Sequence, residues 1–347
     1  MTSKDAARRG RDGFAARVEA PAKVNLTLKV LGRRPDGFHE LDTVFQAVAV
    51  SDRVTVTQTA EGRGIDLEVV TRGGGSLPDL GPMEENLAYR AACLFLAAVG
   101  DAGAPSGGGW REGDRGGRSG VAIRLEKAIP PGAGVGGGSS DAAAVLRALN
   151  ALYGGVLTRE ALRNLGAELG SDVPFFLGDS VRARGRGRGE VLTDLPPLPA
   201  RPLVLVFPPV HVATGEAYAA LAAAREGGFR DAGTAAVAAA RTSASAHAPS
   251  DPWGRVYAAV VNDFEKVIAA RVPEVTRALQ FLRGAGPQAA ALSGSGGACF
   301  ALFGRAGEAE AVASAAREEL GWPAAATSTL ESWPSVELGG DGSPPGA

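Results

Sequence analysis

Residues 17–30 alternate between apolar and polar side chains, most regularly in the run VNLTLKV. Val24, Leu26, Leu28 and Val30 share one face of an extended chain, and the polar residues between them share the other. This period of two predicts a half-buried strand. By the same reasoning we expect further strands at 44–50, 53–58, 65–70, 121–127, 203–207, 289–294, 298–303 and 324–330.

Apolar residues spaced three and four apart predict helices at 86–99, about 140–152, 159–169, 215–225, 256–271, 274–284 and 307–320. Asn86, Thr158 and Thr214 are candidate N-caps, because a side-chain oxygen there accepts a hydrogen bond from a free backbone N–H. Gly170 is expected to end the helix that follows Thr158. Strands and helices mix without strict βαβ repetition, so the sequence predicts an α+β fold in two domains.

Changes in composition along the chain suggest where the domains begin and end. The predicted boundaries of the 347 residues are a disordered tail at 1–13, a first domain at 14–195, a second domain at 196–333 and a disordered tail at 334–347. Gly-, Ser- and Ala-rich stretches at 100–120 and 226–252 are interpreted as insertions into the first and second domains.

Charge and composition argue against several classes of partner. The formal net charge of −2 provides no bulk attraction to nucleic acid or to an anionic membrane, so we expect neither as a partner. The N-terminus lacks the apolar core of a signal peptide, and no apolar run is long enough to span a bilayer, so we expect a cytoplasmic protein. The two cysteines and three histidines lack the spacing of a zinc site. The oligomeric state stays open between monomer and homodimer.

A glycine-rich loop, PPGAGVGGGSS, separates the strand predicted at 121–127 from the next helix. Glycines let backbone N–H groups face a ligand, and a helix start adds free N–H groups and a positive dipole end, so the loop predicts a phosphate site. Its predicted contacts are Pro130, Pro131, Gly132, Ala133, Gly134, Val135, Gly136, Gly137, Gly138, Ser139 and Ser140. Ser139 and Ser140 can cap the helix or bind a metal ion. A structural turn, the alternative, needs only one or two glycines.

Two common phosphate-binding patterns fit this loop poorly. Gly132, Gly134 and Gly137 match the spacing of a dinucleotide fingerprint, but two prolines precede them. The acid at the required distance, Glu160, lies in a predicted helix, which disfavours an oxidoreductase. The P-loop pattern requires a lysine that this loop lacks. Cationic assistance for a bound nucleoside triphosphate would therefore come from Mg²⁺ and from residues elsewhere.

The segment PPGAGVGGGSSDAAA resembles the phosphate-binding motif of the GHMP kinases, the family of galactokinase, homoserine kinase and mevalonate kinase. APAKVNLTLKVLGRRPDGFHELDTVFQ, LGSDVPFFL and LSGSGGACFALF are similar to other motifs of that family and occur in the family's order, from residue 20 to residue 303. The resemblance implies an N-terminal unit like ribosomal protein S5 domain 2 and a C-terminal ferredoxin-like α/β unit. The stretch DGFHEL resembles those members whose acceptor carries a cytidine diphosphate.

The resemblance further implies an ATP-dependent small-molecule kinase in which Lys23 and Asp172 are catalytic. Phosphoryl transfer to a hydroxyl needs a proton acceptor and a cation near the developing charge, and an aspartate and a lysine suit these roles. A solvated strand lysine and a loop-capping aspartate are the ordinary alternatives. Asn86 and Lys127 are implied as additional ATP contacts. Mg²⁺ is expected on the phosphates, with Ser139 or Ser140 as its protein ligand.

The acceptor contacts implied by the resemblance are Asn25, Phe38, His39, Tyr218, Asn262 and Asp263. Phe38, which replaces a tyrosine common in the family, and Tyr218 would stack on the two faces of cytosine, and His39 would hydrogen-bond the base. Core packing, a surface turn and helix capping are the alternatives for these residues. The turn at 293–297 is expected to bring the backbone of the second domain to the phosphate loop.

Two other functions remain possible on these observations. Another GHMP kinase would act on homoserine, mevalonate or a sugar, but none of these has a base to stack. A nucleotide-binding protein without kinase activity would not need Lys23 and Asp172 together.

Overall fold

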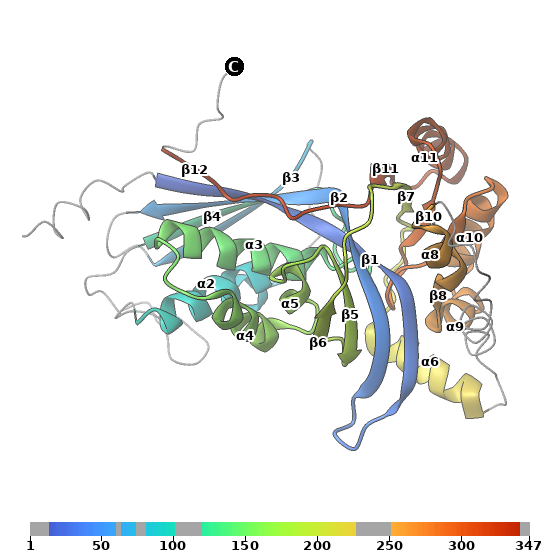
Figure 1. Ribbon diagram of the computed structural model, residues 1–347, viewed down its shortest axis with the longest axis horizontal. Helices are drawn as coiled ribbons and strands as arrows, with labels where there is room; N and C mark the ends of the chain where they lie inside the picture. Colours follow the sequence, from blue (N-terminus) through green and yellow to red (C-terminus); the bar gives the residue numbers. More distant parts are fainter. Residues whose placement is uncertain (1–13, 60–63, 74–80, 101–119, 227–250, 341–347) are drawn as a thin grey trace, which may run out of the picture.

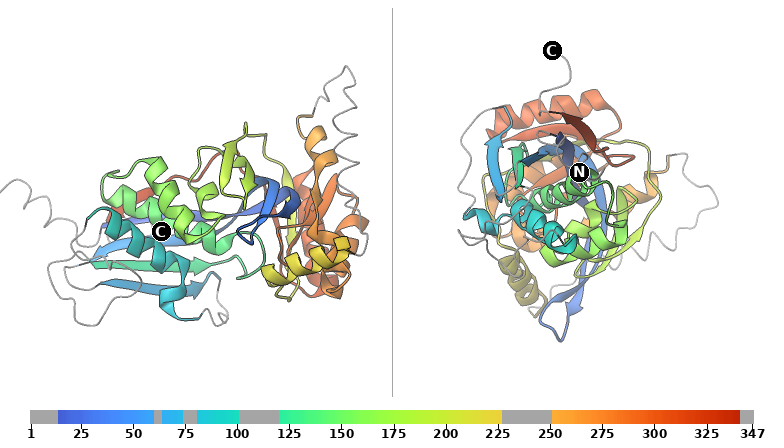
Figure 2. Two further views of the ribbon diagram at one scale, coloured as in Figure 1. Left: turned by 90° about the horizontal axis from the view of Figure 1, so that it is seen from below. Right: turned by 90° about the vertical axis from the view of Figure 1, so that its left-hand side faces the viewer.

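The computed structural model describes residues 14–59, 64–73, 81–100, 120–226 and 251–340. The predicted tail at 1–13 and nearly all of the insertions predicted at 100–120 and 226–252 lie outside these residues. An eight-stranded sheet and a four-stranded sheet follow one another along the long axis of the molecule, and helices cover both (Figures 1 and 2). This mixed architecture confirms the predicted α+β class.

The larger sheet is built mainly from the N-terminal half of the chain. Its strands are β1 (Phe14–Arg33), β2 (His39–Thr59), β3 (Ile65–Thr71), β4 (Gly120–Lys127), β5 (Arg182–Gly187), β6 (Val191–Asp194), β8 (Val261–Asn262) and β12 (Glu337–Gly340). The main order is β12-β1-β2-β4-β3, while β5 pairs with β2 and β6, and β8 pairs with β1. The pairs β3–β4 and β1–β8 are parallel, and the other pairs are antiparallel.

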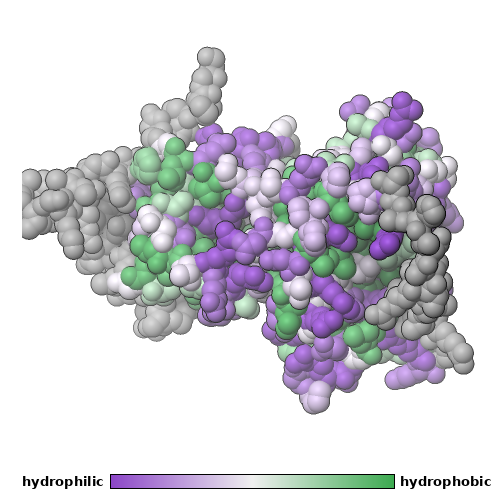
Figure 3. Space-filling view, viewed as in Figure 1, coloured by the Kyte–Doolittle hydropathy of each residue, from purple (hydrophilic) through white to green (hydrophobic). Residues whose placement is uncertain are grey.

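Strands β1 and β2 form one long hairpin whose closed end projects beside helix α6 (Thr214–Glu226) (Figure 1). The prediction of separate strands at 44–50 and 53–58 is wrong, because β2 is continuous through both. Its register against β1 shifts between Pro21 and Ala22, so residues 49–50 are an irregularity within one strand. Hydrophilic residues predominate on the face of the projecting end that Figure 3 shows.

Four helices cover one face of the larger sheet: α2 (Leu87–Ala98), α3 (Gly137–Leu152), α4 (Arg159–Leu169) and α5 (Val173–Phe176), with a 3-10 turn at Met83–Glu85 before α2 (Figure 1). Two of the predicted caps are confirmed. Asn86 Oδ1 accepts a hydrogen bond from Ala88 N at 2.9 Å, and Thr158 Oγ1 accepts one from Ala161 N at 3.2 Å. Helix α3 lies at the centre of this core, which places the phosphate loop before it in the middle of the molecule.

The smaller sheet has the order β11 (Ala324–Ser328), β7 (Pro202–Val206), β10 (Cys299–Leu302) and β9 (Ala289–Leu292), all antiparallel. The remaining helices in the described ranges are α8 (Gly254–Ala259), α9 (Phe264–Ala269), α10 (Pro273–Gly284) and α11 (Ala306–Leu320). Val204 and Val206 pack into the core with α6 and α9 to α11, whereas Leu203 and Leu205 pack into a core shared with β1. Burial of both faces explains why this strand reads as an unbroken apolar run.

The prediction of a single helix over 256–271 is wrong. The segment forms α8, the short strand β8 and α9, because β8 pairs with β1 and the Asn262 side chain holds it there. Asn262 Nδ2 donates to the carbonyl oxygens of Leu292 and Gly294, at 2.9 and 2.7 Å, and its Oδ1 accepts from Phe264 N at 2.9 Å. Side-chain bonds to backbone groups thus replace helical bonds at this point.

The C-terminal segment returns to the larger sheet. Residues 337–340, expected within a disordered tail, form β12 and pair with residues 14–17 of β1, so that part of the prediction is wrong. Trp333 and Val336 pack on the core of the larger sheet. None of the described helices is long and apolar enough to cross a membrane.

Candidate active site

The phosphate loop is held between the two sheets by backbone contacts. Lys23 N donates to Val135 O at 2.8 Å, and Ala298 N donates to Ala133 O at 3.0 Å. Gly134 has φ +86°, and a Cβ added there would lie 2.8 Å from Ser293 O. Only glycine permits so close an approach of two backbones. The expected contact between the 293–297 turn and the loop is therefore confirmed.

The loop and the first turn of α3 line a cavity of about 520 Å³. His211, which follows β7, closes one side of it, and its Nδ1 lies 2.8 Å from the position of a Cβ on Gly132. Helix α3 begins after Gly136, which has φ +74°, so Ser139 and Ser140 lie inside its first turn and do not cap it. Ser139 lines the cavity, whereas the hydroxyl of Ser140 is buried and has no hydrogen-bond partner among the described residues.

Lys23 and Asp172, the predicted catalytic pair, are in contact. Lys23 Nζ lies 3.3 Å from Asp172 Oδ2 and donates a hydrogen bond to Asn25 Oδ1 at 2.7 Å. Asn25 Nδ2 in turn donates to Thr43 Oγ1 at 2.8 Å, and Thr43 Oγ1 donates to Thr27 O at 2.6 Å. The lysine side chain is 5% exposed and that of the aspartate is 32% exposed. The ammonium is thus fixed in place, while the carboxylate remains accessible to a ligand.

A second cavity, of about 810 Å³, opens from this pair. Lys23, Asn25 and Asp172 line it, and so do Phe38, His39 and Tyr218. Six residues predicted from distant parts of the sequence therefore surround one space. Gly134, Gly136 and Ser139 line both cavities, so the two adjoin at the start of α3.

The aromatic side chains pair differently from the predicted arrangement around a base. His39 stacks on Tyr218, with 4.2 Å between ring centroids and 15° between planes, and Tyr218 meets Phe264 edge-on at 4.9 Å. Burial, and next the charge of Asp172, raise the pKa of Tyr218 to about 12. Burial, followed by Arg33 and Arg225, lowers the pKa of His39, which favours a neutral imidazole.

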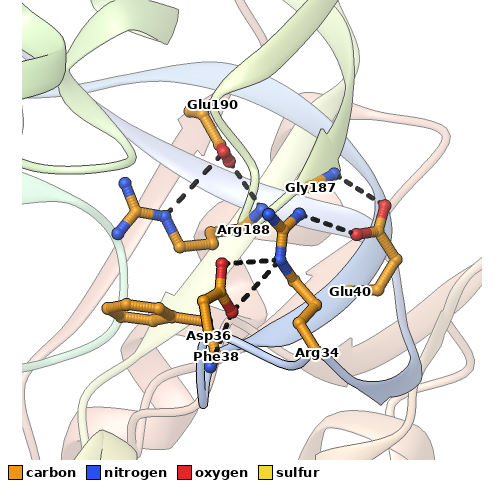
Figure 4. Close-up of polar contacts among 7 residues, drawn as sticks. All are labelled: Arg34, Asp36, Phe38, Glu40, Gly187, Arg188 and Glu190. Carbon is orange, nitrogen blue, oxygen red and sulfur yellow. Dashed lines mark hydrogen bonds and ion pairs between the residues drawn. The ribbon is translucent and has the colours of Figure 1, made fainter.

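Phe38 lies at the mouth of this cavity, and its exposed fraction is 51%. The guanidinium carbon of Arg188, on the turn between β5 and β6, lies 4.5 Å from the centroid of the Phe38 ring. Figure 4 shows the polar contacts that join the two turns: Arg34 contacts Asp36 and Glu40, and Glu40 Oε1 accepts from Gly187 N at 3.1 Å. The Phe38–Arg188 pair is thus positioned by two hairpins that lie far apart in the sequence.

Lys127 is buried between two carboxylates beneath the phosphate loop. Its Nζ donates to Asp52 Oδ2 and, at 2.7 Å, to Asp141 Oδ2. Asp52 Oδ1 also accepts from Ile129 N at 2.8 Å and from Ala128 N. Burial lowers the pKa of Lys127, but the carboxylates outweigh this effect and the pKa is raised. Burial raises the pKa of Asp141, and Lys127 opposes that rise.

We refer to the cavity of about 520 Å³ as the phosphate cavity and to that of about 810 Å³ as the acceptor cavity, after the ligands predicted for them. Three predicted contacts line neither cavity. Asn86 caps α2. Asn262 binds backbone groups as described above, and Asp263 Oδ2 accepts from Val30 N at 2.8 Å and pairs with Arg225 at 3.2 Å. These side chains hold β1, β8 and the helices in position around the cavities. Lys127 lines the phosphate cavity despite its two carboxylate partners.

Sequence reasoning missed Asp52, Thr43, His211 and Arg188. Asp52 and Thr43 act through contacts between strands, which no local motif reveals. His211 stands alone among apolar and proline residues, and Arg188 lies in the arginine-rich run RARGRGRGE, where a solvated strand is the simplest interpretation. Pairing with distant segments gives all four their positions.

Among the described residues, no group of three or more His, Cys, Asp or Glu side chains could hold a metal ion. A magnesium ion on nucleotide phosphates keeps several waters and needs few protein ligands, usually oxygens. Ser139 carries such an oxygen and lines both cavities, and the carboxylate oxygen Asp141 Oδ1 is buried without a hydrogen-bond partner in the described part of the chain. The donors present therefore fit Mg²⁺ held mainly by a nucleotide.

Comparisons with known proteins agree with this geometry. The family model for the GHMP kinases N terminal domain matches residues 86–179, and that for GHMP kinases C terminal matches residues 250–321. The 4-diphosphocytidyl-2-C-methyl-D-erythritol kinase of Solibacter usitatus is 39% identical, over 83% of this chain and 81% of that protein. The protein of the same name from Pelotomaculum thermopropionicum is 41% identical, over 82% of this chain and 87% of that protein.

Solved structures give the same result. A crystal structure of 4-(cytidine 5'-diphospho)-2C-methyl-D-erythritol kinase is 37% identical with a TM-score of 0.66, and the match covers 90% of this chain and 98% of that one. Homoserine kinase from Cytophaga hutchinsonii, at 18% identity and TM-score 0.66 over 95% of this chain and 98% of that one, shares the fold. The implied family and its ATP-dependent kinase activity are confirmed. The chain belongs to the GHMP kinases and, within them, to the family of 4-diphosphocytidyl-2-C-methyl-D-erythritol kinases.

Proposed function

We propose that this protein transfers the γ-phosphoryl group of ATP to the 2-hydroxyl of 4-diphosphocytidyl-2-C-methyl-D-erythritol. The products are the 2-phosphate and ADP, and the reaction belongs to the methylerythritol phosphate route to isoprenoid precursors. The observation that carries the proposal is the Lys23–Asp172 pair, which lies in a cavity that adjoins the phosphate loop and contains aromatic side chains. The names of the relatives support the choice of acceptor.

ATP binds with its phosphates on residues 130–140 in this proposal. The backbone N–H groups of the loop and of the first turn of α3 face the anion, and the helix dipole adds to the attraction. Bound Mg²⁺, for which Ser139 is the proposed protein ligand, would neutralise charge on the phosphates. His211 borders the same cavity and is a further candidate contact for the nucleotide.

The acceptor hydroxyl is placed between Asp172 and the γ-phosphate. Its oxygen forms a bond to phosphorus, its proton passes to Asp172 Oδ2, and the bond from phosphorus to the bridging oxygen breaks so that ADP leaves. Lys23 stabilises the negative charge that develops on the acceptor oxygen. Asn25 fixes the direction of the ammonium through its 2.7 Å hydrogen bond.

The cytidine diphosphate portion occupies the aromatic part of the larger cavity. Phe38 and Tyr218 are its proposed stacking residues, and neutral His39 can hydrogen-bond the base. The His39–Tyr218 stack leaves no space for a base between those two rings. The base therefore lies toward Phe38, where the planar guanidinium of Arg188 offers an additional stacking surface.

A substrate panel tests the function directly. ADP release by the purified protein with Mg-ATP would be measured with 4-diphosphocytidyl-methylerythritol, methylerythritol phosphate, homoserine, mevalonate and galactose. Turnover with the cytidine compound alone supports the proposal. Turnover with another compound would show that the proposed acceptor is wrong, while the kinase mechanism would stand. ATP binding without turnover on any compound contradicts kinase activity. The cytoplasmic location, the lack of nucleic-acid and membrane partners and the oligomeric state stay predictions.

A further inference from the structure

A third cavity, of about 410 Å³, lies among α3, α4, the end of α5 and the C-terminal segment around Trp333. None of its lining residues lines the phosphate cavity or the acceptor cavity. Nothing in the proposed reaction uses this space.

Arg147, on α3, contributes a cation without a counter-ion to this cavity. Its Nη2 donates to Pro334 O, and no carboxylate pairs with it among the described residues. Burial, and next the nearby Arg159, lower the pKa of the guanidinium, so the protein itself disfavours this charge. Charged groups that leave water are normally paired, because desolvation is costly.

A second donor, beside the cavity, also lacks an acceptor. Trp333 Nε1 is buried and has no hydrogen-bond partner in the described part of the chain. An indole N–H can only donate, so it can be satisfied only by an acceptor. Arg159 at the rim pairs with Asp179, which leaves the charge of Arg147 uncompensated. The unpaired charge of Arg147 therefore favours a ligand with negatively charged acceptor atoms.

The rest of the lining combines polar side chains, such as Asn150 and Asp179, with apolar ones. Leu162, Phe176, Trp333 and Val336 contribute to the wall, and Trp333 meets Phe176 and Phe175 at inclined angles with centroids 6.1 and 5.3 Å apart. An inorganic ion would leave this surface uncovered, whereas a small molecule with an apolar body would bury it. The cavity thus combines one cationic end with an aromatic and aliphatic wall.

We propose that this cavity is a second ligand site, which takes a small organic anion with a phosphate or carboxylate head group and an apolar body. The head group lies against Arg147, and the apolar body packs on Phe176 and Trp333.

Helix α5 connects this site to the proposed catalytic residues, so a bound ligand could change their positions. Phe176 ends that helix, which begins directly after Asp172. Its Cζ lies 3.1 Å from the position of a Cβ on Gly136, and Lys23 Cγ lies at the same distance from that position. A ligand that moves Phe176 is therefore expected to change kcat, a consequence that rests on the proposed kinase function.

Calorimetric titration with phenyl phosphate tests the site, with a non-hydrolysable ATP analogue and Mg²⁺ filling the phosphate cavity. We expect saturable binding that Arg147→Gln weakens by about tenfold or more, since the variant loses the charge-assisted hydrogen bond proposed between Arg147 and the head group. Arg163→Gln, on α4 but outside the cavity, is the matched control and should bind normally. Benzoate shows whether a carboxylate head group can replace the phosphate. Inorganic phosphate shows whether binding needs the apolar body. Benzyl alcohol, which lacks the charge, should not bind.

Tryptophan fluorescence provides a measurement that does not depend on the arginine variant. Phenyl phosphate should change the emission of the wild-type protein, and Trp333→Phe should abolish that change. Absence of saturable binding, or equal affinity in wild type and Arg147→Gln, would overturn the site. An unchanged kcat at saturating phenyl phosphate would refute the coupling through α5. The substrate panel above tests the kinase function separately, so failure of one proposal is not mistaken for failure of the other.

Discussion

Asp172 Oδ2 lies 3.3 Å from Lys23 Nζ, although the lysine belongs to the first strand of the chain and the aspartate to the turn before α5. The Lys23 ammonium is held by a hydrogen bond to Asn25, whereas the Asp172 carboxylate remains open to the acceptor cavity. This asymmetry suits a fixed cation and an accessible proton acceptor.

Replacement of Asp172 by Asn should reduce kcat by about 10²- to 10⁴-fold, because the amide cannot take the proton of the acceptor hydroxyl. The affinity for ATP should change little, since Asp172 does not line the phosphate cavity. Steady-state kinetics and equilibrium ATP titration separate the two effects. Glu168→Gln, on the exposed side of α4, is the control and should keep wild-type turnover. Near-normal kcat in Asp172→Asn would remove the aspartate from the mechanism.

Arg188→Ala should raise KM for the cytidine substrate by about tenfold and leave KM for ATP unchanged. The change removes the guanidinium from the face of Phe38, and a cation over an aromatic ring contributes about 0.5–2 kcal/mol. Arg188→Lys keeps the charge but loses the planar surface, so it should recover only part of the affinity.

Arg186→Ala is the matched control for Arg188→Ala, because it removes an exposed arginine from strand β5 of the same hairpin, outside the acceptor cavity. Similar KM values in the two alanine variants would attribute the effect to the overall charge of the hairpin and would contradict a role for Arg188.

Gly134→Ala should lower the free energy of unfolding by about 1–3 kcal/mol and weaken ATP binding. The new methyl group would lie 2.8 Å from Ser293 O, and the backbone would keep a positive φ that alanine disfavours. Gly138→Ala, in the first turn of α3 directly after the loop, is the control, because its nearest contact would be Leu87 Cδ1 at 3.8 Å. Urea denaturation measures both variants. Equal stability would mean that the loop and the 293–297 turn separate at little cost.

Lys127→Met should destabilise the protein by about 3–5 kcal/mol, because it leaves Asp52 and Asp141 buried without their cation. A lysine that served only as a nucleotide contact would instead raise KM for ATP without a loss of stability. Urea denaturation and ATP kinetics on the same preparation distinguish these outcomes. The paired replacement of Lys127 by Met and Asp141 by Leu should recover part of the stability, since it also removes one of the carboxylates.

The sequence predicts the contacts whose geometry is local. The alternation over residues 23–30 places Lys23 and Asn25 on one face of β1, and both side chains line the acceptor cavity as expected. The glycine loop, the caps Asn86 and Thr158 and the 293–297 turn are equally evident, because each depends on a few adjacent residues.

Contacts between distant segments were less predictable. His39 contacts Tyr218 where a hairpin meets a helix, and Phe38 contacts Arg188 where two hairpins meet. The periodicity of a sequence does not indicate which distant elements meet. Residues 256–271 show the same limit. A helical pattern was interrupted there because Asn262 binds backbone oxygens that belong to another strand and turn.

Strand β1 contributes side chains to the cores of both sheets. Ala16, Val18 and Ala20 pack under α2 and α3, while Ala22, Val24 and Leu26 pack against β7 and β10. The two halves of the protein therefore share one continuous structural element and cannot lose their packing independently. We expect one cooperative melting transition, and we expect neither half to persist as a folded fragment after proteolysis between them.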